Sequence, residues 1–263
     1  MMTQPGVPLF EQYEFFPRRS DYCLLIPVIN EGERIAAELE RAQKAHVHQI
    51  VDIVLCDGGS TDGSCTQKKL QKAGVNSLLI KKGPGRQGAQ LRCGIYFALQ
   101  RGYEGVLTID GNNKDSIEDV PRFLQKLKEG YDFVQGSRYV KGGKAVRTPW
   151  VRHLAVHLIH APIISLTARH RFTDTTNAYR AYSKKYLIHP EVQPLRDVFV
   201  GYELLAYLIG FAGLRGPGDT ILSQNGKNSH QNQSFQRKCR FIKGAVCQCR
   251  WAVQSLKKEK RVL

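Results

Sequence analysis

The sequence predicts an α/β fold, with a single Rossmann-like and mostly parallel sheet flanked by helices. Two observations lead to this prediction. Short apolar runs of strand length alternate with longer segments of helical period, which is typical of βαβ units. Several of these runs also end in an acid or a small polar residue, as strands do at the ligand-binding edge of an open parallel sheet. The clearest run is Val106–Ile109, which stops at Asp110 and continues as Gly-Asn-Asn-Lys-Asp.

The alternation is clearest up to Gln135. Residues 1–20 contain several prolines and aromatic residues without a regular period, so we expect an N-terminal arm there. Strands are predicted at Tyr22–Val28, Ile50–Cys56, Ser77–Lys81, Gly105–Asp110 and Asp132–Gln135. Helices are predicted from Asn30 to Lys44, from the loop after Asp57 to Ala73, from Gly88 to Gln100 and from Ser116 to Lys128.

Beyond Gly136 the pattern becomes less regular. Helices are predicted at Val151–Ala168 and Phe199–Leu214, and strands at Ala178–Ser183 and Ile221–Leu222. The first of these helices carries one arginine, three histidines and a proline, which is too polar a content for a membrane-spanning segment. We expect three regions: the arm 1–20, a main domain 21–230 and a basic amphipathic tail 231–263.

The charge balance predicts an anionic partner. The formal net charge is +16, which favours nucleic acid, a membrane surface or phosphorylated substrates. The segment from Arg237 to Arg261 contains nine Lys or Arg residues and only one acid, Glu259. Apolar residues recur in it at roughly helical spacing. This pattern predicts interfacial helices on an anionic membrane, or alternatively a solvated helix. Binding to nucleic acid is not expected, because the aromatic residues form no recognisable RNA-binding motif.

Cysteine usage and the N-terminus predict a cytoplasmic protein. The seven cysteines do not have the spacing of a disulfide framework, and no secretory signal is visible. Cys23 and Cys56 lie in apolar strand runs, so we expect them to be small core residues in a reducing compartment.

Two loops at strand ends have residues that suit a nucleotide. Asp57-Gly-Gly-Ser-Thr-Asp-Gly63 joins a carboxylate to flexible backbone, and Asp57 can accept hydrogen bonds from a nucleobase or ribose. The same segment could instead be only a tight turn with Asp62 as a helix N-cap. Gly83–Gly88, which contains Arg86, could cradle a phosphate, but it matches neither the dinucleotide fingerprint nor the P-loop.

The order of the motifs resembles the family-two glycosyltransferases of the GT-A fold. The motifs are Ile26-Pro-Val-Ile-Asn-Glu31, Asp57-Gly-Gly-Ser-Thr-Asp-Gly-Ser64, Asp110-Gly-Asn112, Gly136-Ser-Arg-Tyr139 and Asp174-Thr-Thr-Asn-Ala-Tyr-Arg180. Within that family they are most similar to dolichyl-phosphate mannose synthases and related polyprenyl-phosphate sugar transferases. The resemblance covers about residues 22–230.

The resemblance implies an inverting enzyme that moves a hexose from a GDP- or UDP-linked sugar to a polyprenyl or dolichyl phosphate. Such an enzyme would be peripheral to the cytoplasmic face of a membrane. The alternative is a soluble glycosyltransferase that acts on a hydroxyl group of a glycan or metabolite.

The resemblance also implies roles for individual residues. The donor would be held by Pro27, Glu31, Asp57, Arg86, Asp110, Asn112 and Lys114. The acceptor's phosphate would be met by Arg138, Arg152, Arg180 and Lys227. Asp110 would lie beside the diphosphate and its Mg²⁺ or Mn²⁺, and Arg138 and Asp174 complete the candidate catalytic set. A hydroxyl acceptor would need a general base, for which Asp174 and Glu203 are candidates. The alternative for Asp174 is that it serves only to orient Arg180.

Two departures from the family pattern concern the metal. Asn112 stands where the second carboxylate of Asp-x-Asp is expected, and Lys114 occupies a position that often ligates the metal. Hard divalent cations prefer carboxylates, so we expect a reduced metal affinity. Lys114 could neutralise the diphosphate directly, or it could be a solvated loop cation.

Overall fold

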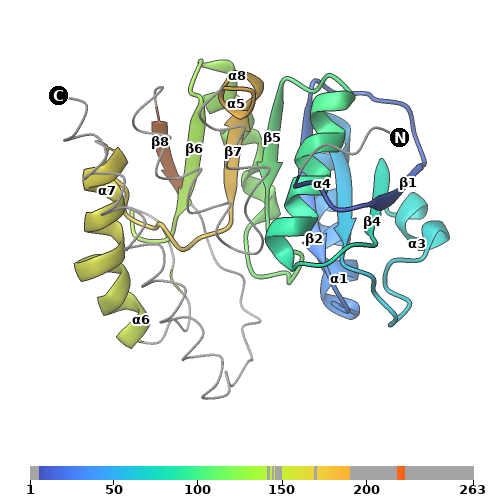
Figure 1. Cartoon of the computed structure of the whole chain (residues 1–263), viewed down its shortest axis with the longest axis horizontal. Coiled ribbons are helices and arrows are strands. Elements are labelled where there is room, and N and C mark those ends of the chain that lie inside the picture. The colour runs from blue at the N-terminus through green and yellow to red at the C-terminus, as the bar shows by residue number, and fades with distance from the viewer. Residues whose placement is uncertain are drawn as a thin grey trace.

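The protein is built on one mixed sheet of eight strands between two layers of helices (Figure 1). The computed structural model describes residues 6–140, 143, 145, 150–168, 171–189 and 218–222. The strand order is β1-β4-β3-β2-β5-β7-β6-β8. The strands are β1 (Phe10–Glu14), β2 (Tyr22–Val28), β3 (Asp52–Asp57), β4 (Ser77–Lys81), β5 (Gly105–Thr108), β6 (Phe133–Ser137), β7 (Arg180–Ser183) and β8 (Gly218–Leu222).

Most strands run in one direction. The pairs β4–β3, β3–β2, β2–β5 and β6–β8 are parallel, whereas β1 and β7 run antiparallel to their neighbours. Because β7 lies between β5 and β6, these two strands share the direction of the parallel set. The carboxyl ends of β2, β3, β5 and β6 therefore meet at one edge, together with the amino end of β7.

The predicted strands are all present, with boundaries shifted by a few residues. β1 was not predicted, since Phe10–Glu14 belongs to the segment interpreted as an arm. It is an edge strand in which only Phe10 and Tyr13 are half-buried, so its sequence has no apolar run. Ala178–Ser183 was predicted as a strand without a direction, and the structure makes it the antiparallel β7.

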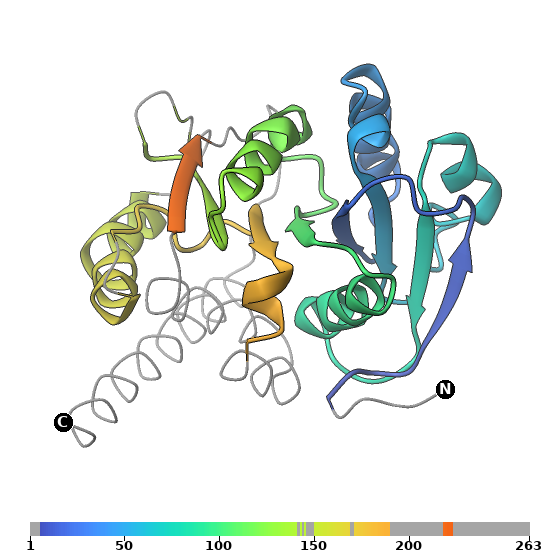
Figure 2. The same ribbon diagram turned by 90° about the horizontal axis from the view of Figure 1, so that it is seen from above.

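Helices cover both faces of the sheet (Figure 2). They are α1 (Glu33–Lys44), α2 (Val47–Ile50), α3 (Gln67–Lys72), α4 (Gln87–Gln100), the 3₁₀ turn η1 (Ile117–Asp119), α5 (Val120–Lys128), α6 (Trp150–Ala155), the π-helical turn η2 (Val156–His160), α7 (Ala161–Ala168) and α8 (Lys184–Leu187). One core lies under α1, α3 and α5, and a second lies under α4, α7 and α8. As expected, Cys23 and Cys56 are buried core residues with free thiols.

Helix α4 lies unusually close to the sheet. A Cβ atom at Gly94 would stand 2.7 Å from the Cys56 Sγ atom and 2.8 Å from a Leu25 methyl, so only glycine permits this approach. The close packing places the first turn of α4 at the carboxyl edge of the sheet, beside the ends of β2 and β3.

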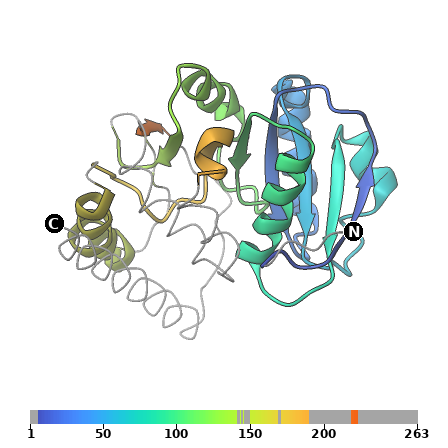
Figure 3. The ribbon, with the colours of Figure 1, turned by 45° about the horizontal axis from the view of Figure 1, so that its top comes forward.

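The predicted helix Val151–Ala168 is present but irregular. The N–H of Ala161 bonds to the carbonyl of Val156, five residues back, and Pro162 follows directly. Proline cannot donate to a helical carbonyl, and a π turn is a common adjustment at such a position. The segment lies at the far end of the molecule from β1 and α3 (Figure 3).

Two of the predicted C-terminal features cannot be compared with the fold. Phe199–Leu214 and the interfacial helices of the tail 231–263 lie outside the described residues. Among the residues that are described, no helix has the length and apolar content needed to cross a membrane.

Candidate functional site

The predicted donor residues gather at the carboxyl edge of the sheet. Val28 pairs with Asp57 at the ends of β2 and β3, and the Gly58 N–H donates to the Val28 carbonyl at 2.9 Å. The loop after β5 crosses the end of β2, because a Cβ atom at Gly111 would stand 2.5 Å from a Val28 methyl. Asp57 and Asp110 are therefore at the same edge, as predicted.

The loops after β2 and β3 are joined by side-chain hydrogen bonds. The Thr61 N–H donates to Asn30 Oδ1 at 2.8 Å, and the Gly32 N–H donates to Asp62 Oδ2 at 2.9 Å. Asp57 is buried, and its Oδ1 atom accepts from the backbone and hydroxyl of Ser60 at 2.9 and 2.6 Å. The carboxylate thus shapes the loop that would receive a nucleoside.

Asp62 does not have the role that the turn interpretation gave it. Helix α3 begins at Gln67 with Thr66 as its N-cap, so Asp62 is too early to cap it. Its Oδ1 atom accepts from the Ser64 backbone and hydroxyl, and its Oδ2 atom holds the β2 loop. The longer loop leaves more exposed backbone beside β3 than a tight strand-to-helix turn would.

Two glutamines of α4 tie the edge together. Gln90 is buried and donates to the carbonyls of Val28 and Cys56, at 2.6 and 2.9 Å. One turn earlier, Gln87 donates to Asp110 Oδ1 at 2.5 Å. Neither residue was predicted, although a pair of amides on the sheet-facing side of a helix is a usable signal. Arg86, the predicted phosphate residue, is exposed at the N-cap of this helix.

Glu31, Asp110 and Lys114 share one electrostatic environment. The pKa of Glu31 is raised, chiefly by partial burial, with Asp110 adding repulsion and the cations Arg34 and Lys114 opposing the rise. Lys114 is half-buried in the loop after β5, so it is not simply a solvated cation. Pro27 is buried in β2, and its carbonyl faces Gly111.

Asp115 is an acid of this site that the sequence analysis did not select. Only 5% of its surface is exposed, and its pKa rises to about 7, through burial first and then repulsion from Asp110. Arg138 and Lys114 oppose that rise, and Asp174 adds to it. Asp115 is therefore close enough to interact electrostatically both with Asp110 and with Arg138, the arginine that was predicted to meet the acceptor. Its place five residues after Asp110 was the available signal.

Arg138 is clamped by Asp174. Its Nε and Nη2 atoms donate to the two carboxylate oxygens at 2.6 and 2.8 Å, and its backbone N–H donates to Oδ2 at 3.1 Å. The side chains are 7% and 0% exposed. Within the described residues the Nη1 atom donates no hydrogen bond, so it is the part of the guanidinium left for an anion. These bonds favour the second role considered for Asp174, the orientation of an arginine, but that arginine is Arg138 rather than Arg180.

Arg180 stabilises the site through buried hydrogen bonds. It is buried and donates from Nε to Gln135 Oε1 at 2.8 Å and from Nη2 to the Thr175 carbonyl at 3.1 Å. These bonds fix the loop that carries Asp174. The structure does not bring this guanidinium to the surface, so its predicted effect on an acceptor is indirect.

Of the other residues predicted to act on the acceptor, only Arg152 lies within the described part of the chain. Arg152 lies in α6, whereas Lys227 and Glu203 lie outside the described residues. The helix that contains Arg152 packs beside Arg138, because the rings of His153 and His157 contact Tyr139 with centroid separations of 5.0 and 4.5 Å.

The acids of the edge suit a cation shared with a diphosphate. Mg²⁺ and similar ions bind through one or two carboxylates plus substrate phosphates. Asp110 offers one carboxylate, and Asp115 is near enough to repel it. The Asn112 Oδ1 atom instead accepts the Lys114 N–H at 3.2 Å, so this side chain stabilises its own turn. No three His, Cys, Asp or Glu residues of the described chain form a metal-binding group by themselves. The reduced metal affinity stays a prediction.

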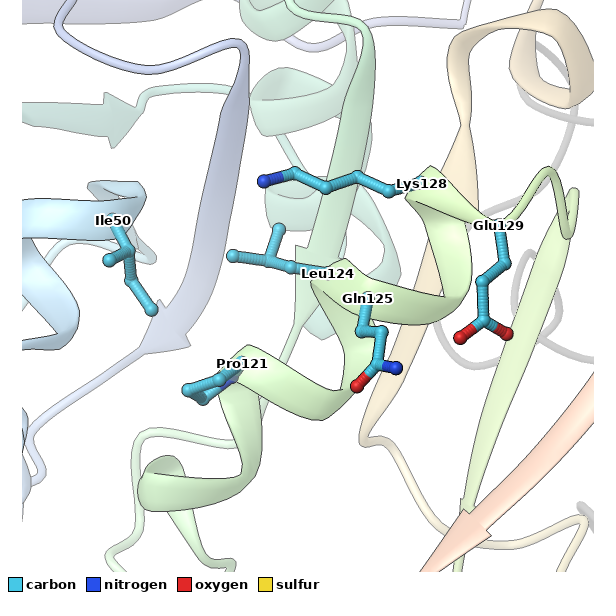
Figure 4. A pocket seen from close by; sticks show the side chains of 6 residues that line it. All are labelled: Ile50, Pro121, Leu124, Gln125, Lys128 and Glu129. Atoms are coloured by element: carbon cyan, nitrogen blue, oxygen red, sulfur yellow. The ribbon is translucent and has the colours of Figure 1, made fainter.

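A separate pocket lies at the opposite edge of the sheet. It has a volume of about 660 Å³ and contains none of the predicted residues (Figure 4). Its lining residues come from the end of α2 and from α5; they are Ile50, Pro121, Leu124, Gln125, Lys128 and Glu129.

The chain belongs to glycosyl transferase family 2, whose family model matches residues 23–189. The family predicted from the motifs is therefore confirmed. Similar proteins include the polyprenol monophosphomannose synthase of Mycolicibacterium smegmatis, 29% identical over 62% of this chain and 62% of that protein. The undecaprenyl-phosphate mannosyltransferase of Micrococcus luteus is 28% identical over 68% of this chain and 73% of that protein. The chain thus spans less than two thirds of the length of the first of these relatives and somewhat more of the second.

Solved structures support the GT-A-like fold. The mannosyl-3-phosphoglycerate synthase of Rubrobacter xylanophilus has a TM-score of 0.62 at 16% identity, over 91% of this chain and 75% of that one. The glucosyl-3-phosphoglycerate synthase of Mycobacterium tuberculosis, in complex with Mn²⁺, UDP and glucosyl-3-phosphoglycerate, has a TM-score of 0.56 at 16% identity, over 89% and 78% of the chains. At this identity the likeness concerns the fold alone.

Proposed function

We propose that the protein transfers a hexose from a nucleotide sugar to a polyprenyl or dolichyl phosphate at a membrane surface. The observation that supports this most strongly is the juxtaposition of an acidic donor edge with a clamped arginine, Arg138. Relatives whose names specify polyprenol and undecaprenyl phosphate acceptors support the same acceptor class.

In this proposal the nucleoside lies in the loops after β2 and β3. Asp57 and Glu31 flank the space, and the backbone held by Asn30 and Asp62 gives it a fixed shape. The diphosphate then lies against the loop after β5, where Asp110 is aligned by Gln87. A bound divalent cation would neutralise charge on the leaving diphosphate, and Lys114 contributes a positive charge from the same loop.

The acceptor phosphate would bind at the Nη1 side of Arg138. Asp174 holds the guanidinium by two side-chain bonds, so it is already oriented when the acceptor arrives. A phosphate oxygen attacks the anomeric carbon in line, the bond from that carbon to the diphosphate oxygen breaks, and the diphosphate leaves with the electron pair. A phosphate monoester is already anionic, so no strong general base is required.

The helix of α6, η2 and α7 would contact the membrane. Trp150, Leu158 and Leu166 are 75%, 66% and 69% exposed, and Val151, Leu154 and Ile159 are about half exposed. Large apolar side chains in such numbers on one helix suit the headgroup boundary of a bilayer. Because His153 and His157 of the same helix contact Tyr139, the helix lies beside the residue that follows Arg138. The basic tail 231–263 would add attraction to anionic lipids.

A hydroxyl acceptor is the second candidate, and Asp115 is the observation that favours it. Such an acceptor needs a base near neutral pH, and the pKa of Asp115 rises to about 7 through burial and the nearby Asp110. Asp174 is less suited, since its carboxylate is fully buried and bonded to Arg138.

The test offers radiolabelled GDP-mannose and UDP-glucose to the enzyme, with undecaprenyl or dolichyl phosphate and with Mg²⁺, Mn²⁺ or EDTA. Label that partitions into the organic phase supports the proposed reaction. Label found only in a water-soluble product contradicts the lipid acceptor and favours the hydroxyl one. Salt-sensitive binding to nucleic acid without any transfer would contradict both.

A further inference from the structure

Helix α1 holds the acidic loop after β5 from its outer side. Glu38 Oε2 accepts the Asn113 N–H at 3.0 Å, and Arg41 Nη1 donates to Asn113 Oδ1 at 2.7 Å. Arg41 also donates from Nε to Glu118 Oε1 at 2.8 Å and from Nη2 to the other oxygen of Glu118. One helix therefore grips the middle of the loop and the start of the turn η1 that follows it.

The gripped residue has an unusual backbone. Asn113 has a φ angle of 57°, in the left-handed region that residues with a Cβ rarely adopt. Asparagine tolerates this conformation better than most residues with a Cβ, but a single position of the loop still requires contacts that hold it. The two contacts from α1 do so, and the resulting turn brings Lys114 and Asp115 to the same side as Asp110. The electrostatic effect of Asp110 and Lys114 on Asp115 reflects that gathering.

The grip is mostly shielded from solvent. Glu38 is 0% exposed and Asn113 is 9% exposed, although Glu118 lies at the surface. Burial raises the pKa of Glu38; its bond from Asn113 opposes the rise, and the Asp115 and Asp110 carboxylates add to it. Glu38 therefore serves the loop as a hydrogen-bond acceptor, which makes Gln the conservative replacement.

We propose that Glu38 and Arg41 are positioning residues that set the Asp110–Asp115 loop against the diphosphate of the donor. The proposal rests on the proposed function and extends it to a helix that touches no substrate. The same helix begins just after Glu31, so α1 links the nucleoside side of the site to the diphosphate side.

The position of the loop should matter mainly in the transition state. Charge grows on the diphosphate as the anomeric bond breaks, and groups aimed at that charge accelerate the step only if they are already in place. In the proposed function, nucleoside binding depends on the loops after β2 and β3. Within the described residues, the side-chain hydrogen bonds of Glu38 and Arg41 go to Asn113 and Glu118 and not to those loops. Loosening the grip should therefore lower kcat more than it raises the KM for the donor.

The experiment measures steady-state transfer to undecaprenyl phosphate from GDP-mannose and from UDP-glucose. The variants are Arg41→Ala, Glu38→Ala and the conservative Glu38→Gln. The matched control is Lys44→Ala, which removes an exposed ion pair to Glu40 on the same helix. We expect kcat to fall about 10- to 100-fold in the two alanine variants, with the donor KM within about threefold of wild type. Glu38→Gln and Lys44→Ala should retain most of the activity.

Several results would overturn the proposal. These are an unchanged kcat in the alanine variants, a donor KM that rises by the same factor as kcat/KM falls, or an equal fall of kcat in Lys44→Ala. Should the alanine variants fail to fold, Asn113→Gly keeps the left-handed backbone but removes the contact with Arg41. In this variant too, kcat must fall more than the donor KM rises.

A failure of the proposed function can be recognised separately. If the wild-type enzyme transfers neither sugar, hydrogen exchange of residues 110–118 still tests the grip. Faster exchange in Arg41→Ala and Glu38→Ala than in Lys44→Ala supports the positioning of the loop. Equal exchange in all three variants contradicts it.

Discussion

Replacing Asp174 with alanine should destabilise the protein strongly. The change leaves the Arg138 guanidinium buried without its counter-charge, since the two side chains are 7% and 0% exposed. Removing one partner of a buried ion pair costs about 3–5 kcal/mol. At 3 kcal/mol the ratio of folded to unfolded protein falls roughly 150-fold. Two charged hydrogen bonds, from Nε and Nη2, account for a loss of this size.

The assay is equilibrium unfolding in urea, with Lys184→Ala as the control. Lys184 contacts Glu104 at 2.8 Å, but these side chains are 35% and 55% exposed. Solvent and salt screen such a pair, so its loss should cost about 0–1 kcal/mol and still less in 1 M NaCl. A double replacement, Arg138→Met with Asp174→Leu, should recover much of the stability without recovering transfer. Similar losses in Asp174→Ala and Lys184→Ala would refute the reasoning.

Three further predictions concern the acids, the metal and the membrane. Burial and the nearby Asp110 raise the pKa of Asp115 from about 3.8 to about 7. The native state therefore retains a proton that the unfolded chain releases, and stability falls as pH rises through that window. In buffer with EDTA, Asp115→Asn should therefore gain stability over wild type between pH 4 and pH 8, by at most roughly 4 kcal/mol; a difference that does not change with pH would contradict this. Asn112→Asp should tighten Mn²⁺ binding, measured by calorimetry with GDP or UDP present, and an unchanged affinity would argue against this loop as the metal site. Leu158→Glu should weaken sedimentation with anionic vesicles more than Leu9→Glu, an equally exposed apolar residue far from that helix; equal effects would count against the proposed membrane surface.

The central strands could be predicted from the sequence because their burial leaves a continuous apolar run. The run in β5, for example, has no exposed residue, and the acid that follows it marks the edge of the candidate site. β1 has no such run, since an edge strand buries only part of one face. The direction of β7 could not be predicted either. The strand is buried between β5 and β6, so it lacks the alternation of buried and exposed residues that marks a half-exposed antiparallel strand.

The partner of Asp174 shows why local spacing was not sufficient. Asp174 and Arg180 belong to one motif, so their pairing was the natural expectation from the sequence. In the fold, β6 and β7 are antiparallel neighbours, which brings the residue after β6, Arg138, to the loop before β7. Asp115 and Asn113 were overlooked for a similar reason, since their importance comes from burial and from contacts with α1.

The most direct test is a crystal structure with GDP or UDP and Mn²⁺ bound. The account requires the nucleoside to lie beside Asp57 and the diphosphate to lie against the Asp110–Asp115 loop, on the side that faces Arg138. A nucleotide bound at the opposite edge of the sheet, for example in the pocket between Ile50 and Lys128, would contradict it.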